Sequence, residues 1–416
     1  MPIISKTLSC GTPLVMEPMS GVKSVGVTWL LPAGNATDPD NRQGMAPMLS
    51  ELLMRGAGGL DSRGFADAMD TMGVSHSVDS ATIHMRMGFS LLGTRLMDAL
   101  PLAVDMVLRP RIEQDAVEPT RDLAMQALEG LSDDPQERAV LAVRERHNPA
   151  PINRSGLGTA EGLAALTREE LIEGWRARAK PVGSVIAIAG DLDAAGGPDA
   201  IASRLDTLLA GWSGAAPAVQ LGHAADRGSL HHIEDKSSQV QIVCMHDAPP
   251  EPSPDCRLER LVSSVLSGGM ASRLFAEVRE KRGLCYAVSQ SYATDRDYGR
   301  CMAYVGTQPE RAQESLDVLL AELQRINTPA GALTAEELQR ALIGIRSSLI
   351  FSGESTGARA SGLASDQYRL GRPRSLEEID AAYASITLDQ VNAYLARRTL
   401  GEVTIVTLGS AEVRRG

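Results

Sequence analysis

The chain of 416 residues repeats itself at an offset of roughly 215 to 220 residues, which restricts it to folds built from two similar units. Near the middle, Thr167 precedes an acidic turn and a helical stretch, and an apolar run over 185–189 then ends at Gly190. Near the end, Thr387 opens the same succession, which closes at Gly409. A threonine before an acidic turn is a typical helix N-cap. Each copy therefore predicts a closing helix followed by a short strand.

The beginnings of the two copies also match, because apolar runs over 25–31 and 240–245 are each followed by a turn and a helical period. The predicted fold is α+β, with two duplicated domains, each a mainly antiparallel sheet with helices packed on one face. We place the N-terminal domain at 1–210 and the C-terminal domain at 228–416. The segment 211–227, which opens with Gly, Ala and Pro, is the predicted linker.

Composition excludes several classes of partner. The net charge is −11 and aromatic residues make up only 3%, whereas sequence-independent nucleic-acid binding needs basic grooves and stacking surfaces. The same acidity disfavours anionic membranes. The five cysteines form no C-x-x-C pair, and Met1–Leu14 lacks the pattern of a signal peptide. We expect a cytoplasmic protein with reduced thiols and no nucleic-acid or membrane partner, although a periplasmic location stays open.

Three motifs resemble those of the insulinase/pitrilysin-type zinc peptidases, which include the mitochondrial processing peptidases. The first runs from Gly44 to Gly56, where the family helix reads Gly-Leu-Ala-His-x-x-Glu-His. The second, Leu266 to Val288, is similar to the C-terminal hallmark of the family, and the third is Asp133-Asp134-Pro135. The resemblance extends from Leu14 to about Glu412, so it implies the duplicated fold of that family for nearly the whole chain.

The resemblance also implies that the zinc site is degenerate. In H-x-x-E-H, two histidines four residues apart bind Zn²⁺ and the glutamate is the general base. The two histidine positions are Pro47 and Glu51, and the base position is Ser50. The third ligand falls near Ala127, counted back from 134–135. Because a hydrolytic zinc needs three protein ligands, we expect neither metal nor cofactor in this chain.

The family's second functional element is intact. It is an arginine and a tyrosine seven residues apart, here Arg279 and Tyr286. The resemblance implies that they bind the substrate backbone and stabilise the tetrahedral oxyanion, in trans with a zinc site on a partner. The pattern predicts a helix over 270–281 that Gly283 ends, with a strand from Tyr286. Taken alone, Arg279 is equally a solvated helix end, and Tyr286 equally a half-buried strand residue.

Together these features favour the non-zinc subunit of a heterodimeric zinc metallopeptidase that degrades peptides. A homologous subunit bearing H-x-x-E-H would supply zinc and the general base. The substrate would be an unfolded peptide that adds a strand to a sheet edge. This chain is not expected to hydrolyse peptides alone. The alternative is a non-catalytic structural or interaction subunit, like the core proteins of respiratory complexes.

Overall fold

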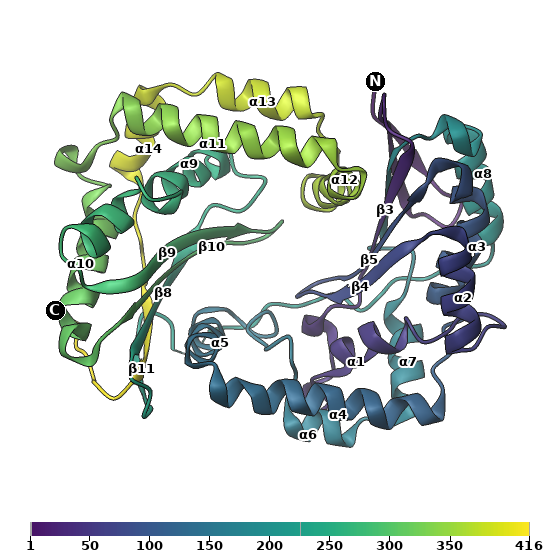
Figure 1. The fold of residues 1–416 in the computed structure, drawn as a ribbon, viewed down its shortest axis with the longest axis horizontal. Coiled ribbons are helices and arrows are strands. Elements are labelled where there is room, and N and C mark those ends of the chain that lie inside the picture. Colours follow the sequence, from purple (N-terminus) through teal and green to yellow (C-terminus); the bar gives the residue numbers. More distant parts are fainter. Residues whose placement is uncertain (1, 225, 416) are drawn as a thin grey trace. The chain divides into compact units, whose positions relative to one another are not determined.

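The computed structural model describes residues 2–224 and 226–415, which form two compact units, each built around one sheet (Figure 1). Unit 1 contains the residues up to Gly130 together with Ala150–Leu221 and Phe351–Ser375. Unit 2 contains Leu131–Pro149, Gly222–Ile350 and the residues from Leu376 onward. The predicted division at 211–227 concerns where the two repeats meet, and it stays a prediction.

The sheet of unit 1 has the strand order β1-β2-β6-β3-β5-β4. Only β2 and β6 are parallel neighbours, and every other pair is antiparallel. The strands are β1 (Ile4–Thr7), β2 (Pro13–Pro18), β3 (Ser24–Leu31), β4 (Ser75–Ser80), β5 (Met85–Leu92) and β6 (Val185–Gly190).

The sheet of unit 2 has the order β7-β11-β8-β10-β9, with β7 and β11 as its parallel pair. It contains β7 (Leu230–Glu234), β8 (Val240–Ala248), β9 (Cys285–Thr294), β10 (Gly299–Thr307) and β11 (Thr404–Gly409). If β1 is set aside, the first sheet has the same strand order as the second, and its one parallel pair, β2 and β6, stands where β7 and β11 stand in the second. The predicted α+β fold of two mainly antiparallel copies is therefore confirmed.

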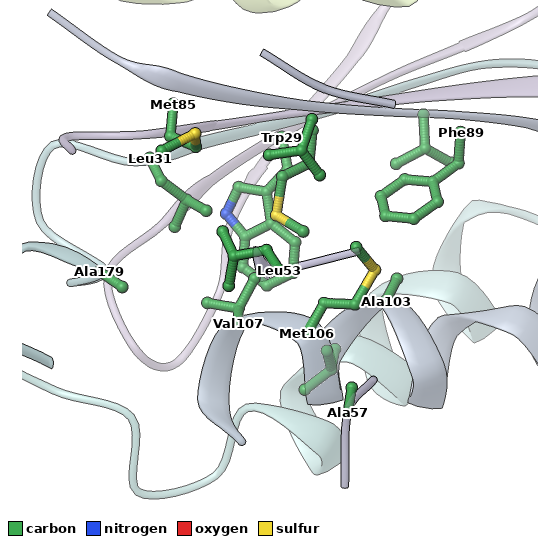
Figure 2. Close-up of a cluster of buried hydrophobic side chains, with 14 of the residues drawn as sticks. Trp29, Leu31, Leu53, Ala57, Met85, Phe89, Ala103, Met106, Val107 and Ala179 are labelled. Atoms are coloured by element: carbon green, nitrogen blue, oxygen red, sulfur yellow. The ribbon is translucent and has the colours of Figure 1, made fainter. Parts of the chain in front are cut away.

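Helices cover one face of the first sheet and enclose the larger part of its core. In Figure 1, α2, α3 and α8 lie along this face, and Figure 2 shows Trp29 and Phe89 from the sheet packing toward Leu53, Met106 and Val107. The helices of unit 1 are α1 (Met45–Leu52), α2 (Ser62–Met72), α3 (Leu96–Leu108), α4 (Gln114–Gly130), α6 (Ala160–Ala165), α7 (Arg168–Arg178), α8 (Pro198–Leu208) and α12 (Thr356–Leu370).

The second sheet has an equivalent helical layer, in which α9, α10 and α14 contribute most of the buried side chains. The helices of unit 2 are α5 (Pro135–His147), α9 (Cys256–Ser267), α10 (Ala312–Arg325), α11 (Ala335–Glu354, whose last turn is assigned to unit 1), α13 (Leu376–Ala384) and α14 (Leu388–Arg397). Within the described ranges, no helix is long and apolar enough to cross a membrane.

Each sheet also carries one helix on its second face, and that helix comes from the other repeat. On the first sheet, α12 packs Ala360 and Ala364 against Ala187 and Ala189 of β6. On the second sheet, α5 packs against β8 and β11 in the same way. Every residue of β6 and β11 is buried, and strands with two buried faces read as continuous apolar runs. The sequence prediction of helices on one face was incomplete in this respect.

Polar contacts fix both exchanged helices. Arg359 of α12 donates to the Glu17 carboxylate on β2 at 2.7 Å and to the Arg374 carbonyl at 2.7 Å. On α5, the fully buried ring of His147 contacts the Thr404 hydroxyl of β11 at 2.9 Å. Because charged and polar groups lose hydration when buried, these contacts specify where each helix sits on its sheet.

A glycine in β3 is required by the close approach of α12. A Cβ on Gly26 would lie 2.4 Å from the carbonyl carbon of Thr356. We therefore expect Gly26→Ala to lower the free energy of unfolding by about 1–3 kcal/mol, the cost of overpacking, measured by urea denaturation. Gly88→Ala on the neighbouring strand β5 is the matched control, since its Cβ would meet only the Ser77 hydroxyl, at 3.2 Å. Equal losses in both variants would contradict this interpretation.

Candidate functional site

The helix that carries the degenerate zinc positions is fixed by a buried ion pair at its start. Asp38 accepts hydrogen bonds from the backbone N–H of Gly44 at 3.0 Å and of Ala46 at 3.1 Å, at the N-terminus of α1. The Arg178 guanidinium donates to the same carboxylate at 2.7 Å, and both side chains are less than 5% exposed. Burial raises the pKa of Asp38, and Arg178 opposes that rise. The start of α1 thus depends on none of the degenerate positions.

The structure places Pro47, Ser50 and Glu51 on α1, all half-buried, and Ala127 on α4, where it is exposed. Pro47 lies in the first turn of α1, where a missing N–H costs no helical hydrogen bond. The Ser50 hydroxyl donates to the Pro47 carbonyl at 2.8 Å, and Glu51 forms an ion pair with Arg55 at 2.8 Å. The two polar side chains are therefore already engaged within or beside the helix.

These residues do not fit a zinc ion. Glu51 is the only metal-binding side chain among the four positions, and three protein ligands are required. Throughout residues 2–224 and 226–415, no group of three or more His, Cys, Asp or Glu side chains is placed to hold a metal ion. The adjacent histidines His231 and His232 form no such group, and the His232 ring contacts the Thr407 hydroxyl at 2.9 Å.

Zinc analysis tests this conclusion. After removal of metal with EDTA, equilibration with equimolar ZnCl₂ and gel filtration, we expect far less than one zinc per chain by elemental analysis. Glu51→Ala should leave that content unchanged, because one carboxylate cannot retain a hydrolytic zinc. Stoichiometric zinc that disappears in Glu51→Ala would contradict the assignment.

The segment that carries Arg279 and Tyr286, the second half-site, combines a wide helical turn with a bulged strand. The segment η6 (Phe275–Glu280) is a π-helix, and the N–H of Lys281 donates to the Ala276 carbonyl, five residues back, at 2.9 Å. In β9, Cys285 pairs with Thr307 and Ala287 with Gly306, which leaves Tyr286 as the extra residue of a β-bulge. Single π-turns and bulges are frequent next to functional sites, where they redirect a side chain.

This geometry brings Arg279 and Tyr286 together. The Arg279 guanidinium carbon lies 5.2 Å from the centre of the Tyr286 ring and 4.8 Å from the centre of the Phe275 ring. Both distances fall within the range of cation–π contacts. The Tyr286 side chain is 79% exposed although it belongs to a strand. The alternative prediction, that Tyr286 is a half-buried strand residue, is therefore wrong.

Arg279 differs from the cations around it in its partners. Arg273 is paired with Glu337, while Lys281 and Arg282 share Glu277 at 2.7 and 2.9 Å. Within the described chain, no carboxylate lies within ion-pair distance of Arg279. Its guanidinium N–H groups are thus available to an anionic or carbonyl ligand. The predicted helix over 270–281 is shorter and wider than expected, because regular helical structure begins only at Arg273.

The loop between the two residues is held by backbone contacts. Arg311 donates to the carbonyls of Arg282 and Gly283 at 3.0 and 2.8 Å, and the Thr307 hydroxyl donates to the Leu284 carbonyl at 2.6 Å. Burial raises the pKa of the adjacent Cys285 thiol to about 11, with Arg279 opposing the rise. This cysteine is protonated at neutral pH and is a poor nucleophile.

Strand β9 is an edge of its sheet, because β10 is its only described neighbour. Beyond Tyr286, its exposed residues are Ala287, Ser289, Ser291 and Ala293. An edge of small residues presents unpaired backbone groups to a further strand. Sequence reasoning did not find this edge, the bulge or the π-turn, because all three depend on pairing between segments distant in the chain.

The Arg273–Glu337 pair ties the start of η6 to α11. Burial opposes ionisation of Glu337, but the Arg273 side chain and the Thr334 N–H outweigh it, and the pKa falls from 4.5 to about 2. A carboxylate whose pKa is lowered by folding stabilises the folded state at pH values above its ordinary pKa of 4.5. This stabilisation is lost as the pH falls toward 2. At pH 7 we expect Glu337→Gln to cost on the order of 1–2 kcal/mol in urea unfolding.

The difference between wild type and Glu337→Gln should shrink as the pH falls from about 4.5 toward 2, since protonation then removes the same charge from the wild type. Glu336→Gln is the matched control, because its carboxylate is 87% exposed and lies 3.9 Å from Arg340. A difference between wild type and Glu337→Gln that is constant with pH would contradict the assignment.

Two models of one peptidase family match successive parts of the chain. Residues 15–156 match the insulinase (peptidase family M16) model, and residues 165–344 match the peptidase M16 inactive domain model. The fold and the motifs thus define a peptidase-like protein with an inactive-type domain. The chain belongs to the insulinase family of peptidases, M16, as its motifs predict.

Relatives of similar length are named as zinc proteases. Proteins called uncharacterized zinc proteases are 26% identical over 97% of this chain in Mycobacterium tuberculosis, covering 93% of that protein, and 23% identical over 95% of both chains in Bacillus subtilis. The crystal structure of a peptidase M16 inactive domain from Pseudomonas fluorescens has a TM-score of 0.88 at 22% identity, covering 100% of this chain and 99% of that one. These similarities agree with the observed fold.

Proposed function

We propose that this chain is the non-zinc subunit of a heterodimeric zinc metallopeptidase that degrades peptides. It contributes Arg279 and Tyr286 for substrate binding and oxyanion stabilisation. The observation that carries the proposal is the contact between these two side chains beside a sheet edge. Arg279 has no carboxylate within ion-pair distance in the described chain, and Tyr286 is 79% exposed. Neither side chain is buried in the core of its unit.

The chemistry of the pair suits a peptide carbonyl. A guanidinium and a phenol are both hydrogen-bond donors, and donors aimed at a developing oxyanion contribute about 3–4 kcal/mol each to catalysis. The cation–π contact holds the guanidinium beside the phenol ring, so both donors start close to one another. They stabilise charge on the substrate oxygen and transfer no proton themselves.

The substrate class follows from the edge strand. A peptide that pairs with β9 would bind through main-chain hydrogen bonds, which are independent of its sequence. The small exposed side chains of β9 would accept many different residues. An unfolded peptide is therefore the substrate best suited to this edge, with Tyr286 at the start of the strand.

The partner is proposed to be a homologous subunit with an intact H-x-x-E-H motif. Zinc and the general base are supplied there, because Pro47, Ser50, Glu51 and Ala127 of this chain cannot supply them. The proposal therefore places no metal and no cofactor in this chain. A cytoplasmic location remains part of the same proposal.

The alternative, a non-catalytic structural subunit, has a fold-level counterpart. A chain in the structure titled "Complex III2 from Candida albicans, Inz-5 bound" has a TM-score of 0.80 at 14% identity, covering 98% of this chain and 96% of that one. That similarity concerns the fold alone. The Arg279–Tyr286 contact is the reason for preferring the peptidase proposal.

Kinetics of the reconstituted pair test the proposal. The chain is mixed with a candidate H-x-x-E-H subunit, and hydrolysis of an unstructured peptide is measured. We expect no activity from this chain alone, and a fall in kcat of about 10²–10³-fold for Arg279→Ala in the mixture, if oxyanion stabilisation is lost. Tyr286→Phe should lower kcat in the same way, and for both variants kcat should fall more than KM rises.

Two matched controls keep the test specific. Lys281→Ala removes a nearby cation that is paired with Glu277, and Tyr292→Phe removes a hydroxyl from the same strand that donates to the Pro249 carbonyl. Both should retain wild-type kcat. Hydrolysis by this chain alone, or unchanged kcat in the two site variants, would contradict the proposal. Co-elution with the partner without any activity would favour the structural alternative.

A further inference from the structure

A cavity of about 550 Å³ opens in unit 1. Its walls come from the end of α3 and the following loop over 109–113, from α7, and from the segment around Trp212. No residue of α1 or α4 lines it. The volume lies within the roughly 300–1,000 Å³ that is usual for small-molecule sites.

Aromatic and aliphatic side chains form the interior of the cavity. Trp175 is 2% exposed and donates its indole N–H to the Val107 carbonyl at 2.8 Å. Trp212 donates to the Ala179 carbonyl at 3.0 Å and stands edge-on to Trp29, with 5.6 Å between ring centres. These hydrogen bonds hold both indoles in place, so the cavity walls are preformed.

The polar lining is strongly cationic in a protein whose net charge is −11. Five arginine or lysine side chains line the cavity, against one carboxylate, Glu113. Arg111 is paired with Glu113, and Arg109 with Asp105 at 2.5 Å. These two cations are therefore largely neutralised by their own neighbours.

Three cations remain for a ligand. Arg168 donates through Nε to the Ile112 carbonyl at 2.6 Å, and its nearest carboxylate, Glu169, is 3.9 Å away. For Arg176 and Lys180, no carboxylate of the described chain lies within ion-pair distance. Cations that line one cavity and are weakly paired or unpaired repel one another, so an anion bound among them gains favourable electrostatic energy.

We propose that this cavity binds a small organic anion that has a flat aromatic body and one anionic group, either a phosphate or a carboxylate. The body packs against Trp212, which is half-buried, and the anionic group is bound by Arg168, Arg176 and Lys180. Arginine presents a planar fork of donors that matches both phosphate and carboxylate oxygens. The site is separate from the proposed peptidase role, since all its residues belong to unit 1 and Arg279 and Tyr286 to unit 2.

The direct test uses 1-naphthyl phosphate as the probe, with binding measured by calorimetry and by tryptophan fluorescence. Two of the three tryptophans in the chain line the cavity, so a bound naphthyl group should change their emission. We expect saturable binding that weakens with added salt, as charge-dependent binding does. The neutral analogue 1-naphthalenemethanol should bind about tenfold more weakly, since it carries no negative charge to attract the cations. A parallel titration with 1-naphthoate shows whether a phosphate or a carboxylate is preferred.

The matched variants are Arg176→Gln with Lys180→Gln, and Arg63→Gln. The double variant should raise the Kd of the probe at least about tenfold, because two unpaired cations are lost. Arg63→Gln removes an exposed arginine of α2 outside the cavity and should leave the Kd unchanged. Absence of saturable binding to the wild-type chain, or equal Kd values in wild type and the double variant, would overturn the proposal.

Discussion

Burial of both faces of one strand in each sheet, β6 in the first and β11 in the second, is the constraint on which the rest of the structure depends. In β6 and β11 every residue is buried, so neither strand can face water on either side. One face is covered by helices of the same repeat and the other by α12 or α5, which come from the opposite repeat. At about 25 cal/mol per Å² of apolar surface, leaving such a face uncovered would be strongly unfavourable. The exchange of helices is thus a condition of stability for both sheets.

The sequence predicts those parts of the fold that depend on local patterns. The Thr167 and Thr387 caps, each with a reciprocal N3 side chain in the structure, mark the helices that precede β6 and β11. The continuous apolar run over 185–189 indicates two buried faces, but it cannot identify the covering helix. That assignment depends on tertiary contacts, such as the approach of Thr356 to Gly26, to which no local pattern points. For this reason the exchange of α5 and α12 was missed.

The candidate site likewise has features that the sequence predicts and features that it does not. The spacing of Arg279 and Tyr286 can be read from the motifs. So can the loss of the ligand positions at Pro47 and Glu51 and of the general base at Ser50. The π-turn in η6 and the bulge at Tyr286 cannot, because Arg311 and Thr307, which hold the intervening loop, lie more than twenty residues further along the chain. Their effect is to place a guanidinium beside an exposed phenol. The motif therefore identifies the two residues, and the fold brings them into contact.

Folding of the chain depends on neither the degenerate zinc positions nor the Arg279–Tyr286 pair. The start of α1 is held by Asp38 and Arg178, so a proline can stand at a metal-ligand position and a serine at the general-base position without disturbing the helix. Arg279 and Tyr286 are also not needed for burial, since one has no carboxylate partner in the described chain and the other is largely exposed. Stability alone would thus tolerate loss at both places. That a cation and a phenol still meet beside an open strand edge is better explained by a ligand than by packing, and a peptide backbone offers the carbonyl groups that both donors can bind.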